Sequence, residues 1–278
     1  MLENAQSDIH SRKEKHLLYW CLSWGMLLLV GLPYALLILM SLGSGWTFPR
    51  LVPDQMDLLP WQRFLSSREG MLSAVLTSAS MSLIVGTAST LGGLIIGRTV
   101  RFSAHGILRF MVYLPFVISP IVIAICLYDL LIRLNLAGTF TGVILVQTLF
   151  ALAFAAVFFS EMWNPRIDRL ELLVKNLGGN RWQVWRHAIL PQIAGLILIC
   201  FIQTALFAWL DYGLVSVVGG GHVVSVTTRL FSYIREANVN QAAQSSLVLL
   251  GPALAGVCCV ILLFSLRMKK DALVETQS

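Results

Sequence analysis

Long apolar runs separated by short polar segments occupy almost the whole chain. Each run is long enough, at about 20 residues or more, to cross a hydrocarbon core of about 30 Å as a helix. We therefore predict an all-α membrane protein with about six transmembrane helices. The runs cover residues 17–42, 71–97, 107–132, 139–159, 192–210 and 247–266.

The composition supports this fold class and restricts the functions. Hydrophobic residues make up 57% of the 278 residues and charged residues only 12%, which is too little charge for a water-soluble surface. The formal net charge is +6. Nucleic-acid binding would need a contiguous basic face with interleaved aromatic residues, and no segment has that pattern. The basic excess is instead typical of membrane topology and of contact with the lipid bilayer.

The distribution of the basic residues predicts the orientation of the chain. Lys and Arg near the ends of spans tend to stay on the cytoplasmic side. If both chain ends are cytoplasmic, 14 of the 20 basic residues lie inside and 6 lie outside. This bias predicts an even number of spans. It also predicts a cytoplasmic tail at residues 1–16, a transmembrane domain at residues 17–266 and a second cytoplasmic tail at residues 267–278.

The run at residues 71–97 differs from the others in its many small side chains. Ser and Gly recur along it, and Gly93 and Gly97 form a GxxxG pattern. Small residues let helices approach one another closely in lipid. We predict that this helix lies inside the bundle and that the pattern serves packing within the chain.

Two prolines interrupt the third run. Pro115 and Pro120 lie on either side of Ser119, and each proline removes a backbone donor from the helix. Irregular backbone at membrane depth is tolerated where protein or a water-filled cavity surrounds it. The prolines therefore indicate either a simple kink or the wall of a translocation path.

A few polar side chains fall within the runs or at their ends. Such groups are costly in lipid and tend to face a cavity or a partner. The two acids among them lie toward the external ends of the third and fifth runs. There they would favour a cationic solute, or they would only contact solvent and partner proteins. The candidates for a translocation path are Ser119, Asp129, Gln147, Gln203 and Asp211.

The polar segment at residues 162–191 combines a basic cluster with apolar residues at helical spacing. Gly can adopt a positive φ, and Asn is a favoured residue at a helix N-cap. We therefore predict two short amphipathic helices joined at Gly178-Gly179-Asn180, the second over residues 181–187. Pro191 is expected to begin the next span. The basic residues are Arg166, Arg169, Lys175, Arg181 and Arg186.

Residues 172–191 resemble the cytoplasmic signature loop of the permease subunits of bacterial binding-protein-dependent ABC importers. Leu177-Gly178-Gly179 matches the Leu-Gly-Ala core of that loop, and Trp182-Gln183 matches a common continuation. Pro191 completes the final Leu-Pro pair thirteen positions after Gly178. Leu172 stands where the family usually has Glu, and Glu171 precedes it by one residue.

This resemblance implies a type I ABC importer permease fold, with a cytoplasmic coupling-helix loop between the fourth and fifth spans. The coupling helix of the family docks on the ATPase subunit. Trp182 and Trp185 would then be large apolar anchors for that contact, or would lie flat in the headgroup layer. The residues that the resemblance assigns to ATPase coupling are Leu177, Gly178, Gly179, Asn180, Trp182, Trp185 and Arg186.

The resemblance also implies partners and a location. These are an ABC ATPase dimer, a second permease subunit that is identical or paralogous, and a periplasmic solute-binding protein in a bacterial inner membrane. The binding protein would dock on residues 43–70 and on residues 212–246, which have a polar, loop-like composition. The chain has no GxxxxGK[ST] motif, so ATP and Mg²⁺ would be bound by the ATPase and no cofactor by this chain.

The stretch from Gly219-Gly220-Gly221-His222 through Phe231-Ser232-Tyr233-Ile234, and then Ala242-Ala243, resembles the external region of the branch that imports iron, thiamine and polyamines.

Two other classes of function remain as alternatives. A self-contained secondary transporter or channel would be favoured by inverted repeats, and no internal repeat is recognisable. A membrane enzyme would need a catalytic constellation, and the chain has no HExxH or GxSxG motif. His105, His187 and His222 all lie near predicted loops, and we expect them to be surface residues. The five cysteines lie in apolar runs, without the spacing of a metal site or a disulfide framework.

Overall fold

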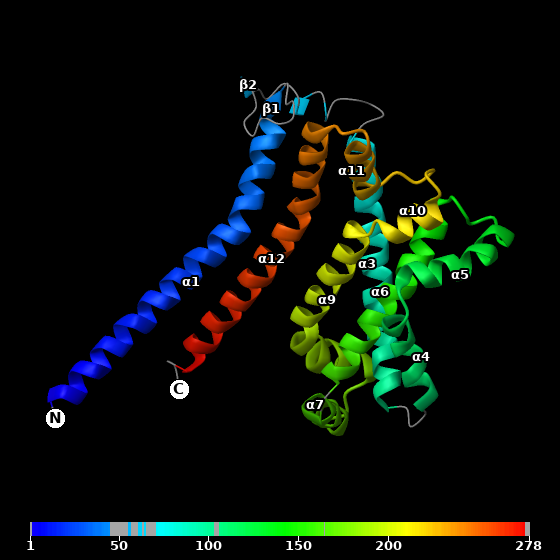
Figure 1. Ribbon diagram of the computed structural model, residues 1–278. Helices are drawn as coiled ribbons and strands as arrows, with labels where there is room; N and C mark the ends of the chain where they lie inside the picture. Colours follow the sequence, from blue (N-terminus) through cyan, green and yellow to red (C-terminus); the bar gives the residue numbers. More distant parts are fainter. Residues whose placement is uncertain are drawn as a thin grey trace.

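The protein is a bundle of long and short helices in the computed structural model, which describes residues 2–44, 55–56, 61–62, 64, 71–102, 106–163 and 165–275 (Figure 1). A two-residue antiparallel pair of strands, β1 (Gly43–Ser44) and β2 (Gln55–Met56), lies at one end. The helices are α1 (Leu2–Leu42), α3 (Met71–Phe102), α4 (Gly106–Val117), α5 (Pro120–Arg133), α6 (Phe140–Met162), α7 (Pro165–Asn176), α8 (Arg181–Gln183), the π-helix η1 (Val184–Ile189), α9 (Leu190–Leu210), α10 (Gly213–Gly219), α11 (Val226–Arg235) and α12 (Val239–Glu275).

The helices agree with the predicted membrane fold. Within the described part of the chain, five helices are long and apolar enough to cross a membrane, or six if α4 and α5 count as one broken span. The all-helical membrane architecture predicted from the apolar runs is therefore confirmed.

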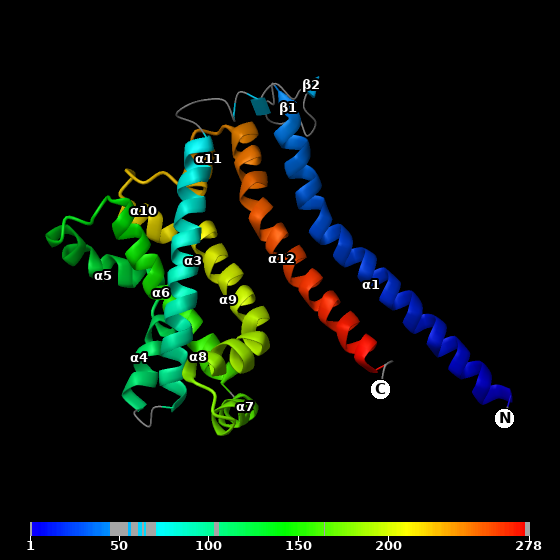
Figure 2. The ribbon, with the colours of Figure 1, turned by 180° about the vertical axis from the view of Figure 1, so that it is seen from behind.

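The predicted close packing of the small-residue helix is confirmed, but its predicted inner position holds for one face only. α3 packs along α6 and α9 (Figures 1 and 2), while Leu76, Leu91 and Ile95 on its other face are 63–71% exposed. A Cβ atom on Gly97 would lie 2.8 Å from the Ala156 carbonyl oxygen and from Phe159 Cβ of α6. On the α9 side, a Cβ on Gly86 would lie 3.0 Å from Ala205 Cβ. The glycines thus permit close contacts within this chain, as the GxxxG pattern predicted.

α1 and α12 lie side by side at their upper ends (Figures 1 and 2). The Asn240 side chain donates to the carbonyl oxygens of Met40, Ser41 and Gly43, over distances of 2.6–3.2 Å. The Gln244 amide also donates to the Ser41 carbonyl, at 3.2 Å. The last carbonyls of a helix have no partner within that helix, so these amides satisfy them. Two polar residues at the start of α12 therefore fix the end of α1.

The third apolar run is broken rather than gently kinked. α4 and α5 meet at an angle of 101°, and the chain turns between Val117 and Pro120. α5 then packs against α10 and α6, where Ala124, Leu131 and Leu214 are buried in one apolar cluster. The pair of prolines thus separates two helices of different direction.

The predicted loop at residues 212–246 is wrong, because this segment is mostly helical. Leu214, Val215 and Val218 of α10 are buried against α5 and α6. Ser225 begins α11 with a reciprocal pair of hydrogen bonds to Thr228, so a polar composition here marks a helix start. α12 begins at Val239, earlier than the apolar run at residues 247–266 suggested. Of the other predicted features, His105 and most of residues 43–70 lie outside the described residues.

The close packing of α3 on α6 leads to a prediction. Gly97→Ala should destabilise the protein by about 1–3 kcal/mol, because the added methyl group would overpack a tight contact. Thermal unfolding of the full chain in lipid nanodiscs measures the change. Gly251→Ala in α12 is the matched control, since a Cβ at Gly251 meets no atom within 4 Å. We expect that control to leave stability unchanged or slightly raised. Equal stability of the two variants would contradict the packing described here.

Candidate functional site

The basic segment at residues 162–191 forms a helical elbow at the end of the bundle opposite α11 (Figure 1). As predicted, a helix is followed by a turn and a capped second helix. The second helix does not stop, however: α8 continues through the π-helix η1 directly into α9. The Leu190 N–H bonds the Trp185 carbonyl five residues earlier, as in a π-helix, and Pro191, which has no N–H, follows directly. The elbow therefore runs into the membrane span α9 without a break in the helix.

The turn itself is tightly specified. Gly178 has a φ of +82°, where a side chain would be strained. A Cβ on Gly179 would lie 2.6 Å from Val174 Cγ1. Asn180 Oδ1 accepts from the Gln183 N–H at 2.9 Å, and Gln183 Oε1 accepts from the Asn180 N–H at 2.8 Å. This capping box fixes the start of α8 and confirms the predicted cap.

The predicted coupling residues separate into two groups. Leu177 is 80% exposed and Trp182 is 69% exposed, so both apolar side chains lie on the surface of the elbow. Arg186 is also exposed. Trp185 is only partly exposed and makes an edge-to-face contact with buried Trp163, at a ring-centroid distance of 6.1 Å. Trp185 therefore supports the elbow from within, while Leu177 and Trp182 are available to a partner.

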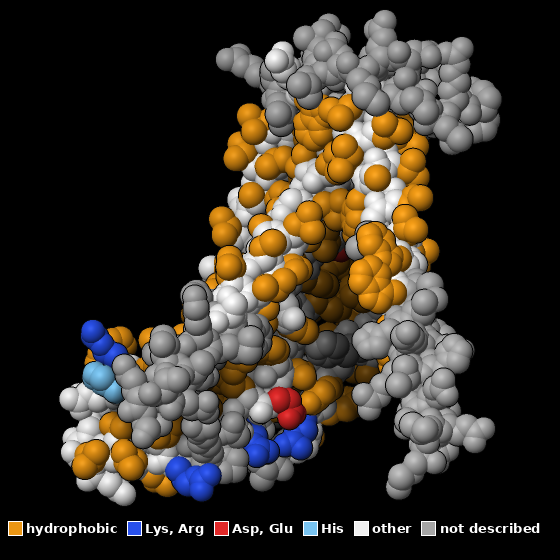
Figure 3. Space-filling view, turned by 90° about the vertical axis from the view of Figure 1, so that its left-hand side faces the viewer, with side chains coloured by type: hydrophobic (Ala, Val, Ile, Leu, Met, Phe, Trp, Pro, Cys, Tyr) orange, Lys and Arg blue, Asp and Glu red, His pale blue; other side chains and the backbone are white. Residues whose placement is uncertain are grey.

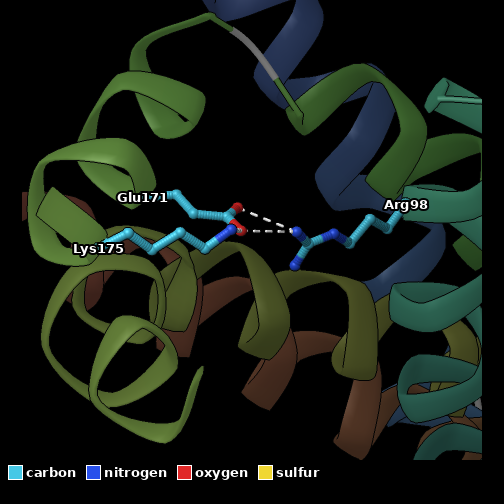
Figure 4. A network of polar contacts seen from close by, with 3 residues as sticks. All are labelled: Arg98, Glu171 and Lys175. Carbon is cyan, nitrogen blue, oxygen red and sulfur yellow. Dashed lines mark hydrogen bonds and ion pairs between the residues drawn. The ribbon is translucent and has the colours of Figure 1, made fainter. Parts of the chain in front are cut away.

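A charge network joins the elbow to α3 (Figure 4). One guanidinium nitrogen of Arg98, Nη2, donates to both carboxylate oxygens of Glu171, at 2.9 and 3.1 Å. Lys175 Nζ also donates to Glu171, at 2.8 Å. The Glu171 side chain is only 14% exposed. In the sequence, Arg98 counts only among the basic residues assigned to the cytoplasmic side, and Glu171 only as a residue one position before the usual Glu of the loop. The two residues are 73 positions apart, so no local pattern joins them.

The pKa of Glu171 reflects two opposing effects. Partial burial alone would raise this pKa. The hydrogen bond from Lys175, the positive charge and hydrogen bond of Arg98 and the charge of Lys175 outweigh burial, so the pKa lies below its usual value. The Glu171 carboxylate is therefore ionised at neutral pH.

Aromatic rings surround the Arg98 guanidinium. Its central carbon lies 5.0 Å from the centroid of Trp163 and 6.0 Å from that of Trp185, within the range of cation–π attraction. One turn further along α3, Arg101 Nε donates to the Trp163 carbonyl at 3.1 Å. A cavity of about 260 Å³ adjoins this network and is lined by Arg98, Glu171, Lys175, Arg181, Val184 and Trp185. Figure 3 shows basic side chains gathered at this end of the molecule, below largely hydrophobic flanks.

A larger cavity of about 670 Å³ lies among α4, α5, α6 and α9. Pro115 and Pro120 line it, so the break in the third run forms part of its wall. Gln203 and Asp211 are the polar path candidates among its lining residues, which are otherwise mainly apolar. Two of the five candidates thus line this cavity.

The other three path candidates lie elsewhere. Gln147 is fully buried behind the cavity and donates to Asp211 Oδ2 at 3.0 Å. Ser119 is exposed and is not among the lining residues. Asp129 is exposed and forms an ion pair at 2.8 Å with Arg133 on its own helix. The two acids therefore have different surroundings, and only Asp211 faces the cavity.

Comparison with known proteins identifies a family and one similar solved structure. Residues 89–268 match the family described as "Binding-protein-dependent transport system inner membrane component". No curated protein matches the chain. Among solved structures, the chain is similar to one described as "Crystal structure of an amino acid ABC transporter with histidines". That pair is 13% identical with a TM-score of 0.46, and the similarity covers 80% of this chain and 97% of the other. The family match includes the elbow and all the residues that line both cavities.

The lowered pKa of Glu171 predicts a pH-dependent contribution to stability. Above the usual pKa of 4.5, ionised Glu171 stabilises the folded protein, and this contribution is lost as the pH falls through the lower folded-state value. Glu171→Gln should therefore reduce stability at pH 7 by about 1.5–3 kcal/mol, the size of a hydrogen bond to a charged group. Thermal unfolding in nanodiscs from pH 7 to pH 3 measures the difference from wild type, which should shrink toward zero in acid.

Asp129→Asn is the matched control for this measurement, because Asp129 belongs to an exposed pair within one helix. Its effect at pH 7 should be less than about 0.5 kcal/mol. A Glu171→Gln deficit that stays constant down to pH 3 would contradict the assigned charge state.

Proposed function

Because the chain belongs to the family of inner membrane components of binding-protein-dependent transport systems, we propose that its elbow at residues 162–191 receives the movement of the ATPase and passes it to the spans. ATPase activity in such a system lies in a separate subunit, and this chain is the ABC permease component. The observation that carries the proposal is the exposure of Leu177 and Trp182 on an otherwise well-fixed turn.

The geometry of the elbow suits a docking surface. Trp is the side chain that most often dominates the energetics of an interface, and a fixed backbone lowers the entropic cost of binding. The capping box and Gly178 fix the turn, while Trp185 holds it from behind against Trp163. Arg181 and Arg186 are exposed beside Trp182, where they would meet carboxylates of the ATPase. The continuity of α8, η1 and α9 gives the movement a direct route into a span.

The cavity of about 670 Å³ is the proposed solute path within this chain. Its volume falls in the usual range for small-molecule sites, about 300–1,000 Å³. Broken helices at membrane depth are tolerated where they line a cavity, and the break between α4 and α5 lies at this wall. Alternating access would open the cavity first to one side and then to the other. Gln203 and Asp211 would contact the solute, and Gln147 would position Asp211 through their hydrogen bond.

The wider assembly is proposed from the family and the charge distribution. Both termini would be cytoplasmic, with tails at residues 1–16 and 267–278 around a transmembrane domain at residues 17–266. α1 begins and α12 ends toward the same side of the molecule as α7, which supports this orientation (Figure 1). An ATPase dimer would bind the elbow, and a periplasmic solute-binding protein would bind the opposite end near α11. A second permease subunit, identical or paralogous, would complete the path.

The branch of the family is a separate proposal. Residues 219–222 and 231–234, together with Ala242-Ala243, support the branch that imports iron, thiamine and polyamines. The first of these stretches ends α10 and the second lies in α11.

Removing the exposed apolar anchors tests the docking proposal. The double variant Leu177→Ala/Trp182→Ala should weaken binding of the partner ATPase by at least about tenfold, because buried anchors contribute most of the affinity at interfaces. Binding of the ATPase to the full chain in nanodiscs measures the effect. Trp24→Ala is the control, since Trp24 is 54% exposed on α1, away from the elbow. If the double variant binds like the wild type, the docking surface is elsewhere.

A variant in the cavity tests the path. Gln203→Leu should lower solute transport by about two- to tenfold, the value of one net hydrogen bond, while ATPase binding stays unchanged. Uptake into proteoliposomes that contain the complete importer measures transport. Gln192→Leu on the same helix is the control, because Gln192 is exposed and does not line the cavity. A wild-type rate in the Gln203 variant would remove this cavity from the path.

A further inference from the structure

Arg98 occupies a junction between four parts of the molecule. It lies near the end of α3 and bonds Glu171 in the middle of α7. Its guanidinium also lies against Trp163, which follows α6, and against Trp185 in η1. Because α7 and η1 both belong to the elbow, the Arg98 side chain of α3 contacts the elbow at two separate helices.

The Arg98–Glu171 pair differs from the other ion pairs of the described residues. Lys175–Glu171 and Arg133–Asp129 each join residues four apart on one helix. Arg98–Glu171 instead joins two elements, and its partners are 32% and 14% exposed. Pairs within one exposed helix add little to the placement of elements, whereas a partly buried pair between elements fixes their relative position.

α3 can transmit a displacement over a long distance. Its 32 residues span about 48 Å as an α-helix, enough to cross the bilayer. Near its other end, Ser78 Oγ accepts a hydrogen bond from the Val226 N–H at the start of α11, at 2.9 Å. In between, the Thr90 hydroxyl lies 3.3 Å from that of Thr204 in α9. One rigid helix therefore connects the elbow with the opposite end of the bundle.

We propose that Arg98 and Glu171 form a latch that passes the displacement of α7 to α3 and, through α3, to the α11 end of the protein. This inference rests on the proposed function, in which the elbow is moved by an ATPase. Arg98 is then a positioning residue: it does not line the cavity proposed as the solute path, and it acts through Glu171.

Arg98 and Glu171 each have another interaction partner besides one another, so either residue can be neutralised without leaving the other unpaired. If Arg98 is neutralised, Glu171 retains the hydrogen bond from Lys175. If Glu171 is neutralised, Arg98 retains the Trp163 and Trp185 rings. Neither single change leaves a buried charge without compensation, the condition that makes broken ion pairs strongly destabilising. A loss of coupling can therefore be separated from a loss of folding.

The test compares Arg98→Gln, Glu171→Gln and the combined variant in the reconstituted importer, with its ATPase, second permease subunit and binding protein. The measured quantity is the amount of solute transported per ATP hydrolysed. We expect each single variant to lower this ratio by about tenfold, which lies within the usual range of coupling between sites. The combined variant should lose no more than either single variant, because both remove the same interaction. Arg98→Lys keeps the charge and should restore much of the ratio.

Two further measurements exclude a purely structural role. The amount of ATPase bound to each variant should equal that of the wild type, and thermal unfolding should show that every variant is folded. Arg133→Gln is the matched control, because it cuts an Arg–carboxylate pair confined to one helix. It should retain the wild-type ratio.

Several outcomes would overturn the latch. They are a wild-type ratio in Glu171→Gln, losses that add in the combined variant, or a loss explained entirely by dissociation of the ATPase. An importer whose wild-type ATPase activity is independent of solute would instead contradict the proposed function itself. The two failures are therefore distinguishable.

Discussion

Close packing of α3 against its neighbours is the constraint on which the rest of the structure depends. Lipid provides no hydrophobic drive for helices to associate, so contact distance and complementary shape decide which helices stay together. Gly86 and Gly97 bring α3 against α9 and α6 so closely that an added Cβ atom would lie only 2.8–3.0 Å from the nearest atom of the neighbouring helix. α3 is thereby held in place along its length, while α1 and α12 present apolar side chains outward. The elbow and the large cavity are both positioned relative to this helix.

The elbow joins apolar packing and charge in a way that suits the transmission of force. Ile167, Val184 and Ile189 are buried with Trp163 in one cluster, which holds the elbow to the bundle without directional bonds. The Arg98–Glu171 pair adds a directional link to α3. The exposed Leu177 and Trp182 lie on the outer side of this arrangement. The elbow is thus fixed to the bundle on its inner side and carries exposed apolar side chains on its outer side. This arrangement suits a segment that binds another protein and moves with it.

Sequence reasoning succeeded where the cause is local. The spans follow from the length of the apolar runs, the close packing of α3 from its small residues, and the Asn180 cap from the chemistry of one side chain. It failed at residues 212–246 because Ser, Thr and Gly indicated a loop, whereas burial of Leu214 and Val218 against α5 stabilises a short helix there. The prolines of the third run indicated a kink or the wall of a path, but not the bend of 101°, which depends on packing of α5 against α10. Arg98 and Glu171 were missed as a pair because only the folded chain brings them together.

If the elbow lies in the cytoplasm and binds the ATPase there, a cysteine at position 182 should react from that side only. Labelling of such a cysteine is the most direct measurement. Trp182→Cys would be placed in a chain whose native cysteines are replaced, and treated in membranes with a thiol reagent that cannot cross the bilayer. We expect the reagent to label the variant from the cytoplasmic side only. Binding of the partner ATPase should protect the cysteine from the reagent. Labelling from the periplasmic side, or labelling that the ATPase does not change, would contradict the claim that an ATPase contacts the elbow from the cytoplasm.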